Sequence, residues 1–244
     1  MRRYIFVALS LLAFSAMAQG KGEVKVQETK AIVMSKTEQL QPYTGVMIDG
    51  TIDVVLRRAE SVEALRAIYD QRSNSVPRVR MGIDKNGVLT ISERAEPQQD
   101  GEVPKVELWY TNLSKIDVSK AAVRFEDVVE GQILDMEVKS GATVEVALKV
   151  LDADVTCTGK SAIKASGEAR YLDLHISNAT FDGVELQTMS TRADASHEAE
   201  VVVAVSERLE AITSTSAKML YKGEPTIIRG KNSLFGGVIE RVKQ

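Results

Sequence analysis

The sequence predicts an all-β protein built as a repetitive solenoid. Between residues 113 and 221, six lines of sequence begin with Leu and then alternate apolar and polar residues, which sends every second side chain to one face of an extended strand. Small and polar residues follow most lines, and no proline interrupts residues 105–224. The line starts lie 21, 17, 21, 14 and 23 residues apart, a mean of about 19, and repetition at this period is typical of solenoids.

Stacking of these lines is expected to bury one leucine per turn. Neighbouring strands lie about 4.8 Å apart, so equivalent side chains would form an internal ladder. The first line fits better when it is shifted by one residue, with Ile116 and Val118 facing inward. The predicted ladder comprises Leu113, Leu134, Leu151, Leu172, Leu186 and Leu209.

The N-terminus reads as a secretory signal peptide. Arg2 and Arg3 precede an apolar stretch over residues 4–14, and Ala16-Met17-Ala18 is a small-residue cleavage site. The apolar stretch is too short for a transmembrane helix, and no longer one follows. We therefore expect cleavage after Ala18 and export of the remaining chain.

Four segments follow from this pattern: the signal peptide (1–18), a segment at 19–42, a β-rich section at 43–112, and the repeats with closing strands at 113–244. The segment at 19–42 is polar with short alternating pieces, so it is either a tether or a first edge strand. The β-rich section is expected to cap the solenoid, because a first turn without a cap exposes an unpaired strand edge.

Two features define the β-rich section. The turn Asp84-Lys85-Asn86-Gly87 between two alternating runs predicts a hairpin, since Asn-Gly tolerates positive φ. The stretch 61–71 can be read as a helical or irregular segment, which we favour slightly, or as a strand.

Composition excludes some partners and leaves one thiol to explain. The net charge is −3, and removal of residues 1–18 leaves 29 basic against 34 acidic residues, or −5, so a nucleic-acid partner is not expected.

Cys157 is the only cysteine, which excludes an internal disulfide. Alternation points Cys157 inward, and we interpret it as a buried structural thiol rather than a reactive one.

The order of several motifs resembles the head GIN-domain family, which is classed as autotransporter adhesins of Gram-negative bacteria. The resemblance covers residues 43–244 and is carried by VMIDGTIDVVL (46–56), GVLTI (87–91), the successive Leu-initiated lines and YKGEP (221–225). It implies a right-handed single-stranded parallel β-helix with an N-terminal β-rich section, and the lines above would make its rungs about 19 residues long. It also implies a role in adhesion or interaction, no recognised catalytic residues, and a location in the periplasm or at the cell surface.

Outward positions of the lines carry the candidate site. In-register stacking would place Asp135, Asp152 and Asp173 about 5 Å apart on one face, where hard cations such as Ca²⁺ or a basic partner could bind. The alternative, which we favour, is a solvated face that keeps the solenoid soluble. This acidic face consists of Asp135, Asp152, Asp154 and Asp173.

Catalytic and metal-binding motifs are not found in the sequence. His175 and His197 are the only histidines, and neither lies in a zinc-binding spacing. The acidic face with Arg170 could be arranged as in a polysaccharide lyase, but aromatics make up only 5% of the chain, and adjacent Trp109 and Tyr110 would expose only one ring. We expect no catalytic residues and no cofactor.

The sequence is therefore interpreted as an exported envelope protein with a binding, adhesion-type or structural role and no enzymatic activity. Its partner would be a protein or glycan of the envelope or cell surface, recognised on a flat face or in the loops, especially 193–200. Two alternatives stay open: a carbohydrate-active β-helix enzyme of lyase or hydrolase type, and a homo-oligomeric envelope scaffold.

Overall fold

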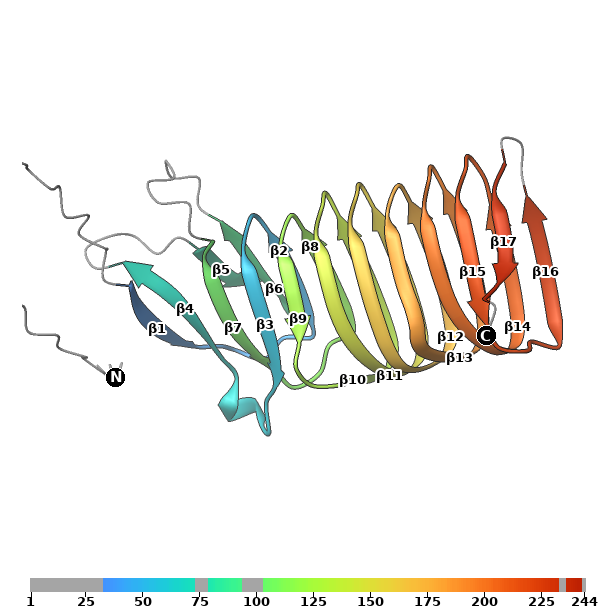
Figure 1. The fold of residues 1–244 in the computed structure, drawn as a ribbon. Coiled ribbons are helices and arrows are strands. Elements are labelled where there is room, and N and C mark those ends of the chain that lie inside the picture. The colour runs from blue at the N-terminus through green and yellow to red at the C-terminus, as the bar shows by residue number, and fades with distance from the viewer. Residues whose placement is uncertain (1–32, 73–78, 94–102, 233–235, 243–244) are drawn as a thin grey trace, which may run out of the picture. The chain divides into compact units, whose positions relative to one another are not determined.

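The repeats coil into rungs that have two faces. The computed structural model describes residues 33–72, 79–93, 103–232 and 236–242 (Figure 1); the predicted signal peptide and its cleavage site lie outside these residues. The long strands of the array are β10 (Val129–Lys139), β11 (Thr143–Thr158), β12 (Ala162–Ser177), β13 (Thr180–Ser196) and β14 (Glu200–Thr213). They pair in parallel, each with the next. The predicted all-β parallel solenoid is confirmed.

Shorter strands complete both faces. Face 1 consists of β6 (Val88–Glu93), β2 (Gly45–Asp49), β8 (Lys115–Ser119), the C-terminal halves of β10–β14 and β16 (Ile227–Asn232). Face 2 consists of β7 (Lys105–Tyr110), β3 (Asp53–Arg58), β9 (Ala122–Phe125), the N-terminal halves of β11–β14, β15 (Lys218–Lys222) and β17 (Val238–Arg241).

The β-rich section at 43–112 contributes rungs as well as antiparallel strands. The β2–β3 rung lies between the β6–β7 rung and the β8–β9 rung, so the chain leaves the stack after β3 and returns to it. In between, η1 (Val62–Ala64) is one short 3₁₀ turn, and β4 (Arg66–Arg72) follows it, so the stretch 61–71 combines both readings.

Antiparallel strands border the stack at this end. Strand β1 (Val33–Gln39) pairs with β4, and β4 pairs with β7, so the described part of the segment 19–42 is an edge strand. The predicted hairpin is confirmed, with β5 (Val79–Ile83) antiparallel to β6. The Asp84 carboxylate accepts hydrogen bonds from the backbone N–H groups of Asn86 and Val88, which stabilises its turn.

The strand register gives the true period of the array. Equivalent positions form the column Leu134, Ala153, Leu172, Thr191, Leu209 and Ile228. The step along the chain is constant, at about 19 residues, except that it is one shorter between Thr191 and Leu209. From Leu134 to Leu209, large and small side chains alternate in this column, so the stacked rungs fit together without crowding. Burial of each Leu contributes on the order of 2 kcal/mol.

The register corrects the predicted leucine ladder at Leu151. This side chain is 40% exposed, and Ala153 takes the inward position between Leu134 and Leu172. The cause is the bend by which each long strand passes from face 2 to face 1, where ladder pairing skips one residue per rung. Two successive side chains, Leu151 and Asp152, both face outward on this bend, and the alternation then resumes shifted by one residue.

The other predicted ladder residues are buried but do not form one column. Leu186 pairs with Gly167 on face 2, because Thr191, five residues further along the chain, is the partner of Leu172. Leu113 precedes β8, whose register places Lys115 beside Asp135 and thus Leu113 one residue out of step with Leu134. Ile116 and Val118 face inward.

Small residues line the edge where face 1 turns into face 2. Each turn there between residues 119 and 218 contains at least one residue with positive φ, which produces the sharp reversal. The buried residue that follows accepts a backbone hydrogen bond from the next rung, as in Ala162 N–H to Ala142 O at 2.9 Å. We call this row the tight edge; its buried residues are Ala121, Ala142, Ser161, Ala179, Ala199 and Ala217.

Substitution of two leucines that look alike in sequence tests the register. Leu172→Asp places a carboxylate in the core and is expected to destabilise the protein by at least about 4 kcal/mol or to prevent folding. Leu151→Asp alters an exposed bend and is expected to change the free energy of unfolding by less than about 0.5 kcal/mol. Urea unfolding, monitored by circular dichroism, measures the free energy of unfolding of both variants. Similar losses for the two variants would contradict the register.

Candidate functional site

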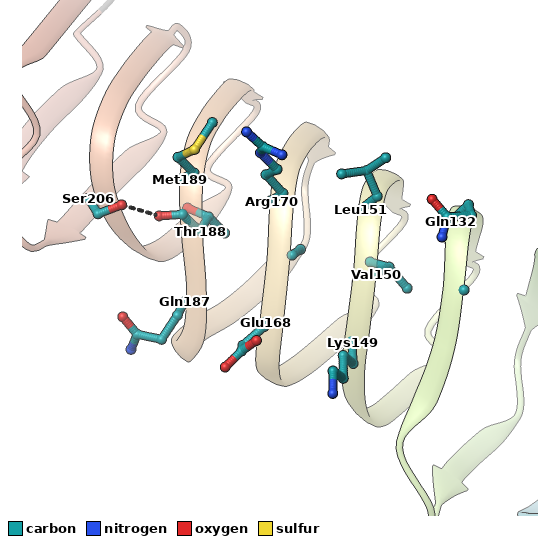
Figure 2. A pocket seen from close by; sticks show the side chains of 12 residues that line it. Gln132, Lys149, Val150, Leu151, Glu168, Arg170, Gln187, Thr188, Met189 and Ser206 are labelled. Carbon is teal, nitrogen blue, oxygen red and sulfur yellow. Dashed lines mark hydrogen bonds between the residues drawn. The ribbon is translucent and has the colours of Figure 1, made fainter.

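An open groove crosses the bends of the long strands. Figure 2 shows its outer wall, in which Gln132, Leu151, Arg170 and Met189 project side by side from β10, β11, β12 and β13. A second row on face 2, consisting of Lys149, Glu168 and Gln187, forms the opposite wall. The groove has a volume of about 480 Å³. We call it the bend groove.

The strand backbone forms the floor of the bend groove. Val150, Ala169 and Thr188 alternate with the wall residues, and their side chains are buried. The Ser206 hydroxyl donates a hydrogen bond to the carbonyl of Thr188 at 3.1 Å and closes the row toward β14. Because each rung contributes one residue to a wall, the wall positions repeat at the strand spacing of about 4.8 Å.

Apolar and aromatic side chains lie beside the outer wall. Ile133 is 66% exposed and Tyr171 is 40% exposed, and both follow wall residues directly in sequence. The Arg170 guanidinium lies 5.5 Å from the centre of the Tyr171 ring, within the range of cation–π attraction. An exposed aromatic ring thus lies next to a wall that carries hydrogen-bonding and apolar groups.

The structure rearranges the predicted acidic face. Asp135, Asp154 and Asp173 occupy adjacent positions of one outward column, whereas Asp152 lies at the bend in register with Ile133 and Tyr171. The predicted stacking of Asp135, Asp152 and Asp173 is therefore wrong, because the same shift at the bend moves Asp152 out of the column. Arg170 lies in the bend groove and not in this column.

Basic residues flank the three carboxylates. The Lys115 ammonium lies 3.8 Å from Asp135, and the Arg192 guanidinium lies 3.9 Å from Asp173, which leaves Asp154 in the middle. Within the described ranges, no three His, Cys, Asp or Glu side chains come together in an arrangement that could hold a metal ion. The column is thus a surface with alternating blocks of charge.

The histidines lie apart from each other. His175 is exposed on β12 and lies 3.6 Å from Asp173. His197 lies in a turn of the tight edge, where its Nδ1 is 3.2 Å from the Ser177 hydroxyl. The predicted irregular loop at 193–200 is in fact the end of β13, this turn and the start of β14.

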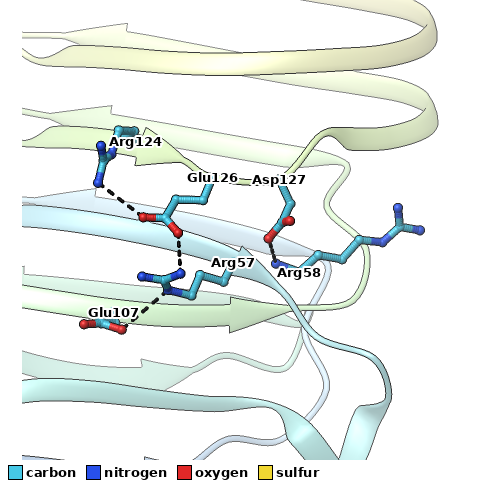
Figure 3. A network of polar contacts seen from close by, with 6 residues as sticks. All are labelled: Arg57, Arg58, Glu107, Arg124, Glu126 and Asp127. Carbon is cyan, nitrogen blue, oxygen red and sulfur yellow. Dashed lines mark hydrogen bonds and ion pairs between the residues drawn. The ribbon is translucent and has the colours of Figure 1, made fainter.

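Arginines and carboxylates join three strands at the N-terminal part of face 2. Arg57 on β3 forms ion pairs with Glu107 on β7 and with Glu126, which follows β9 (Figure 3). The Asp127 carboxylate accepts a hydrogen bond from the backbone N–H of Arg58 at 2.8 Å. These contacts link the β2–β3 rung to the β6–β7 and β8–β9 rungs on either side of it, which is a structural role.

Trp109 and Tyr110 point to opposite sides of β7. Tyr110 is buried, and burial raises the pKa of its hydroxyl to about 12. The Arg66 guanidinium covers Trp109, with its centre 4.0 Å from the indole ring. The tryptophan is therefore engaged within the protein, and Tyr171 is the better candidate for an aromatic contact with a ligand.

Sequence reasoning missed the bend groove. A signal was present, because Gln132, Leu151, Arg170 and Met189 follow each other at one constant interval, and the row of Lys149, Glu168 and Gln187 has the same interval. Alignment on this interval, instead of on each Leu, would have placed the wall residues in rows. The bend itself leaves no local mark that distinguishes Leu151 from the buried leucines.

The fold and its surface rows define the class of protein, an all-β solenoid whose outward side chains repeat from rung to rung. The chain belongs to the family described as "Putative auto-transporter adhesin, head GIN domain", whose model matches residues 42–225. No curated protein matches the sequence. In the described part of the chain, no helix is long and apolar enough to cross a membrane.

Solved structures share the fold at low sequence identity. A putative adhesin from Bacteroides fragilis has a TM-score of 0.76 and 16% identity, over 86% of this chain and 97% of that one. A putative adhesin from Parabacteroides distasonis has a TM-score of 0.69 and 18% identity, over 87% and 98%. A putative lipid binding protein from the same species has a TM-score of 0.63 and 14% identity, over 86% and 97%.

The buried thiol provides a test of core integrity. Cys157 is buried, and desolvation raises the pKa of its thiol from 9.0 to about 12. Because the folded-state pKa is raised, the buried neutral thiol makes its full contribution to stability below pH 9. This contribution is lost as the pH rises toward 12. We expect the free energy of unfolding to fall over this range, and to fall less steeply in Cys157→Ala, as measured by urea unfolding. Rapid reaction of the native thiol with Ellman's reagent at neutral pH would contradict the burial.

The middle carboxylate of the charged column offers another test. Asp154→Asn removes the like-charge contacts with Asp135 and Asp173 and is expected to raise the free energy of unfolding by a few tenths of a kcal/mol, more at low salt. Urea unfolding at two salt concentrations measures the change. Stabilisation of the unmodified protein, but not of Asp154→Asn, by millimolar Ca²⁺ would instead indicate a cation site.

Proposed function

We propose that the protein is an exported, non-catalytic binding protein of the cell envelope that holds an extended glycan in the bend groove. The observation that carries this proposal is the regular row of Gln132, Leu151, Arg170 and Met189 along an open groove. A ligand that lies along the stacking direction meets a new side chain at every rung. An extended polymer fits this geometry better than a compact molecule does.

The chemistry of the walls favours a glycan. Gln132, Gln187 and Arg170 offer planar groups that hydrogen-bond neighbouring hydroxyls, and Glu168 accepts hydrogen bonds. Tyr171 supplies an exposed ring of the kind that packs against the apolar face of a sugar. Membership of an adhesin-type family is consistent with such a role, as are the predicted signal peptide and export.

Catalysis is not favoured by the arrangement of charges. A polysaccharide lyase needs acidic groups and a base that converge on one sugar, whereas Arg170 lies over Tyr171 and the three stacked aspartates lie on face 1. The enzyme alternative predicts release of unsaturated or reducing ends from acidic polysaccharides. This assay separates the two functions.

The binding test uses the chain without residues 1–18 on an array of purified glycans. Arg170→Ala and Leu151→Asp are each expected to weaken binding by at least about tenfold, because they remove wall contacts. Lys218→Ala on face 2, next to the tight edge, is the matched control and is expected to bind like the unmodified protein.

Three outcomes would contradict the proposal. Equal binding by all variants would place the site elsewhere. Turnover of a polysaccharide would establish an enzyme. Binding to phospholipid vesicles without binding to glycans would instead support a lipid ligand, for which the exposed Ile133 and Leu151 would be the contact.

A further inference from the structure

The solenoid ends in two strands whose outer edges carry no described neighbour. Strand β16 pairs with β14 on face 1, and β17 pairs with β15 on face 2, each through one of its two edges. Figure 1 shows β16 as the outermost strand at this end. At the opposite end of the stack, antiparallel strands β1, β4 and β5 border the rungs instead. Free strand edges favour pairing with another chain.

Apolar side chains are exposed beside these edges. Ile228 continues the buried column that contains Leu209, yet it is 49% exposed because no further rung among the described residues covers it. Ile227 is 44% exposed and Val238 is 39% exposed. The end of the stack therefore combines free backbone groups with part of an uncovered core.

Strands β16 and β17 face each other across the interior of the last rung. Their residues can be matched by depth, meaning the distance from the tight edge along the strand direction. A Cβ atom on Gly230 would lie 3.2 Å from Ile239 Cδ1, so these two residues face each other across the interior. β16 runs toward the tight edge and β17 runs back from it. Residues at equal depth are therefore Gly230 with Ile239, and Arg229 with Glu240.

We propose that two copies of this protein pair end to end about a two-fold axis that runs parallel to these strands. Rotation about this axis keeps the depth of every residue and places β16 of one copy against β17 of the other. The paired strands are antiparallel, because β16 and β17 run in opposite directions. Arg229 then lies opposite Glu240 of the second copy, and Gly230 lies opposite its Ile239.

The charges select this pairing over the alternative two-fold arrangement. The outward side of β16 is basic, with Arg229 and Lys231, and the outward side of β17 carries Glu240. A two-fold axis perpendicular to the faces would pair β16 with itself and bring basic residues together, which is unfavourable. The β16–β17 pairing joins opposite charges twice, once on each face.

The arrangement is closed. Each copy uses both of its free edges in one isologous contact, so that no edge remains to add a third copy. Inward and outward positions coincide across the contact, and the exposed Ile228 is covered by the core of the second copy. The proposal does not depend on the function of the bend groove.

Charge reversal tests the pairing on the chain without residues 1–18. The unmodified protein is expected to be a dimer at tens of micromolar in sedimentation equilibrium. Arg229→Glu and Glu240→Arg are each expected to weaken the dimer by at least about tenfold, and the double variant is expected to recover most of the affinity. Arg192→Glu is the matched control, since Arg192 precedes Arg229 in the same column and pairs with Asp173 as Arg229 pairs with Glu210.

Disulfide trapping tests the register. Arg229→Cys with Glu240→Cys is expected to give a covalent dimer on mild oxidation, because the two positions lie directly opposite each other between copies. Within one copy they lie on opposite faces and cannot join. Arg229→Cys with Val238→Cys, shifted by two residues, is the control that should cross-link far less.

Three results would overturn the proposal. A monomeric unmodified protein would leave the end of the stack to another occupant, such as a different protein. A dimer that is insensitive to both charge reversals would use another surface. Equal trapping of the two cysteine pairs would exclude the proposed register.

Discussion

Parallel backbone hydrogen bonding between successive rungs is the constraint on which this structure depends. Each strand of a rung must find its equivalent one rung away, so the rungs keep nearly the same length, about 19 residues each. The chain has only five prolines, and none of these prolines lies between residues 105 and 224, where a proline would remove a hydrogen-bond donor from the ladder. The small buried residues of the tight edge serve the same constraint, because the backbone reverses there within a few residues.

The same register organises the surface into rows. A side chain that faces outward on one rung has a counterpart about 4.8 Å away on the next, so that charge and shape recur along the stack. The bend groove and the column of Asp135, Asp154 and Asp173 are two such rows. Surfaces of this kind suit extended ligands, which meet repeated contacts, whereas catalytic chemistry needs different groups that converge on one point.

The ends of the stack are where the constraint is left unsatisfied. At the N-terminal end, antiparallel strands border the parallel ladder. Arg57 and its carboxylate partners tie the β2–β3 rung to the rungs on either side of it. At the other end, β16 and β17 present free edges and the half-exposed Ile228. This asymmetry directs attention to association through the C-terminal end.

The sequence by itself determined the fold class, the mean period and the family, because alternation and repetition are local properties of the chain. It also predicted the hairpin around Asn86-Gly87 and the inward side chain of Cys157, which depend on neighbouring residues. Only the tertiary structure decided the phase of each rung. At the bend, two adjacent residues face outward, which exposed Leu151, removed Asp152 from the acidic column and created the bend groove. Such a shift cannot be read from the local alternation of apolar and polar residues. It is set by the backbone hydrogen bonds to the next rung, which lies one full repeat away in the chain.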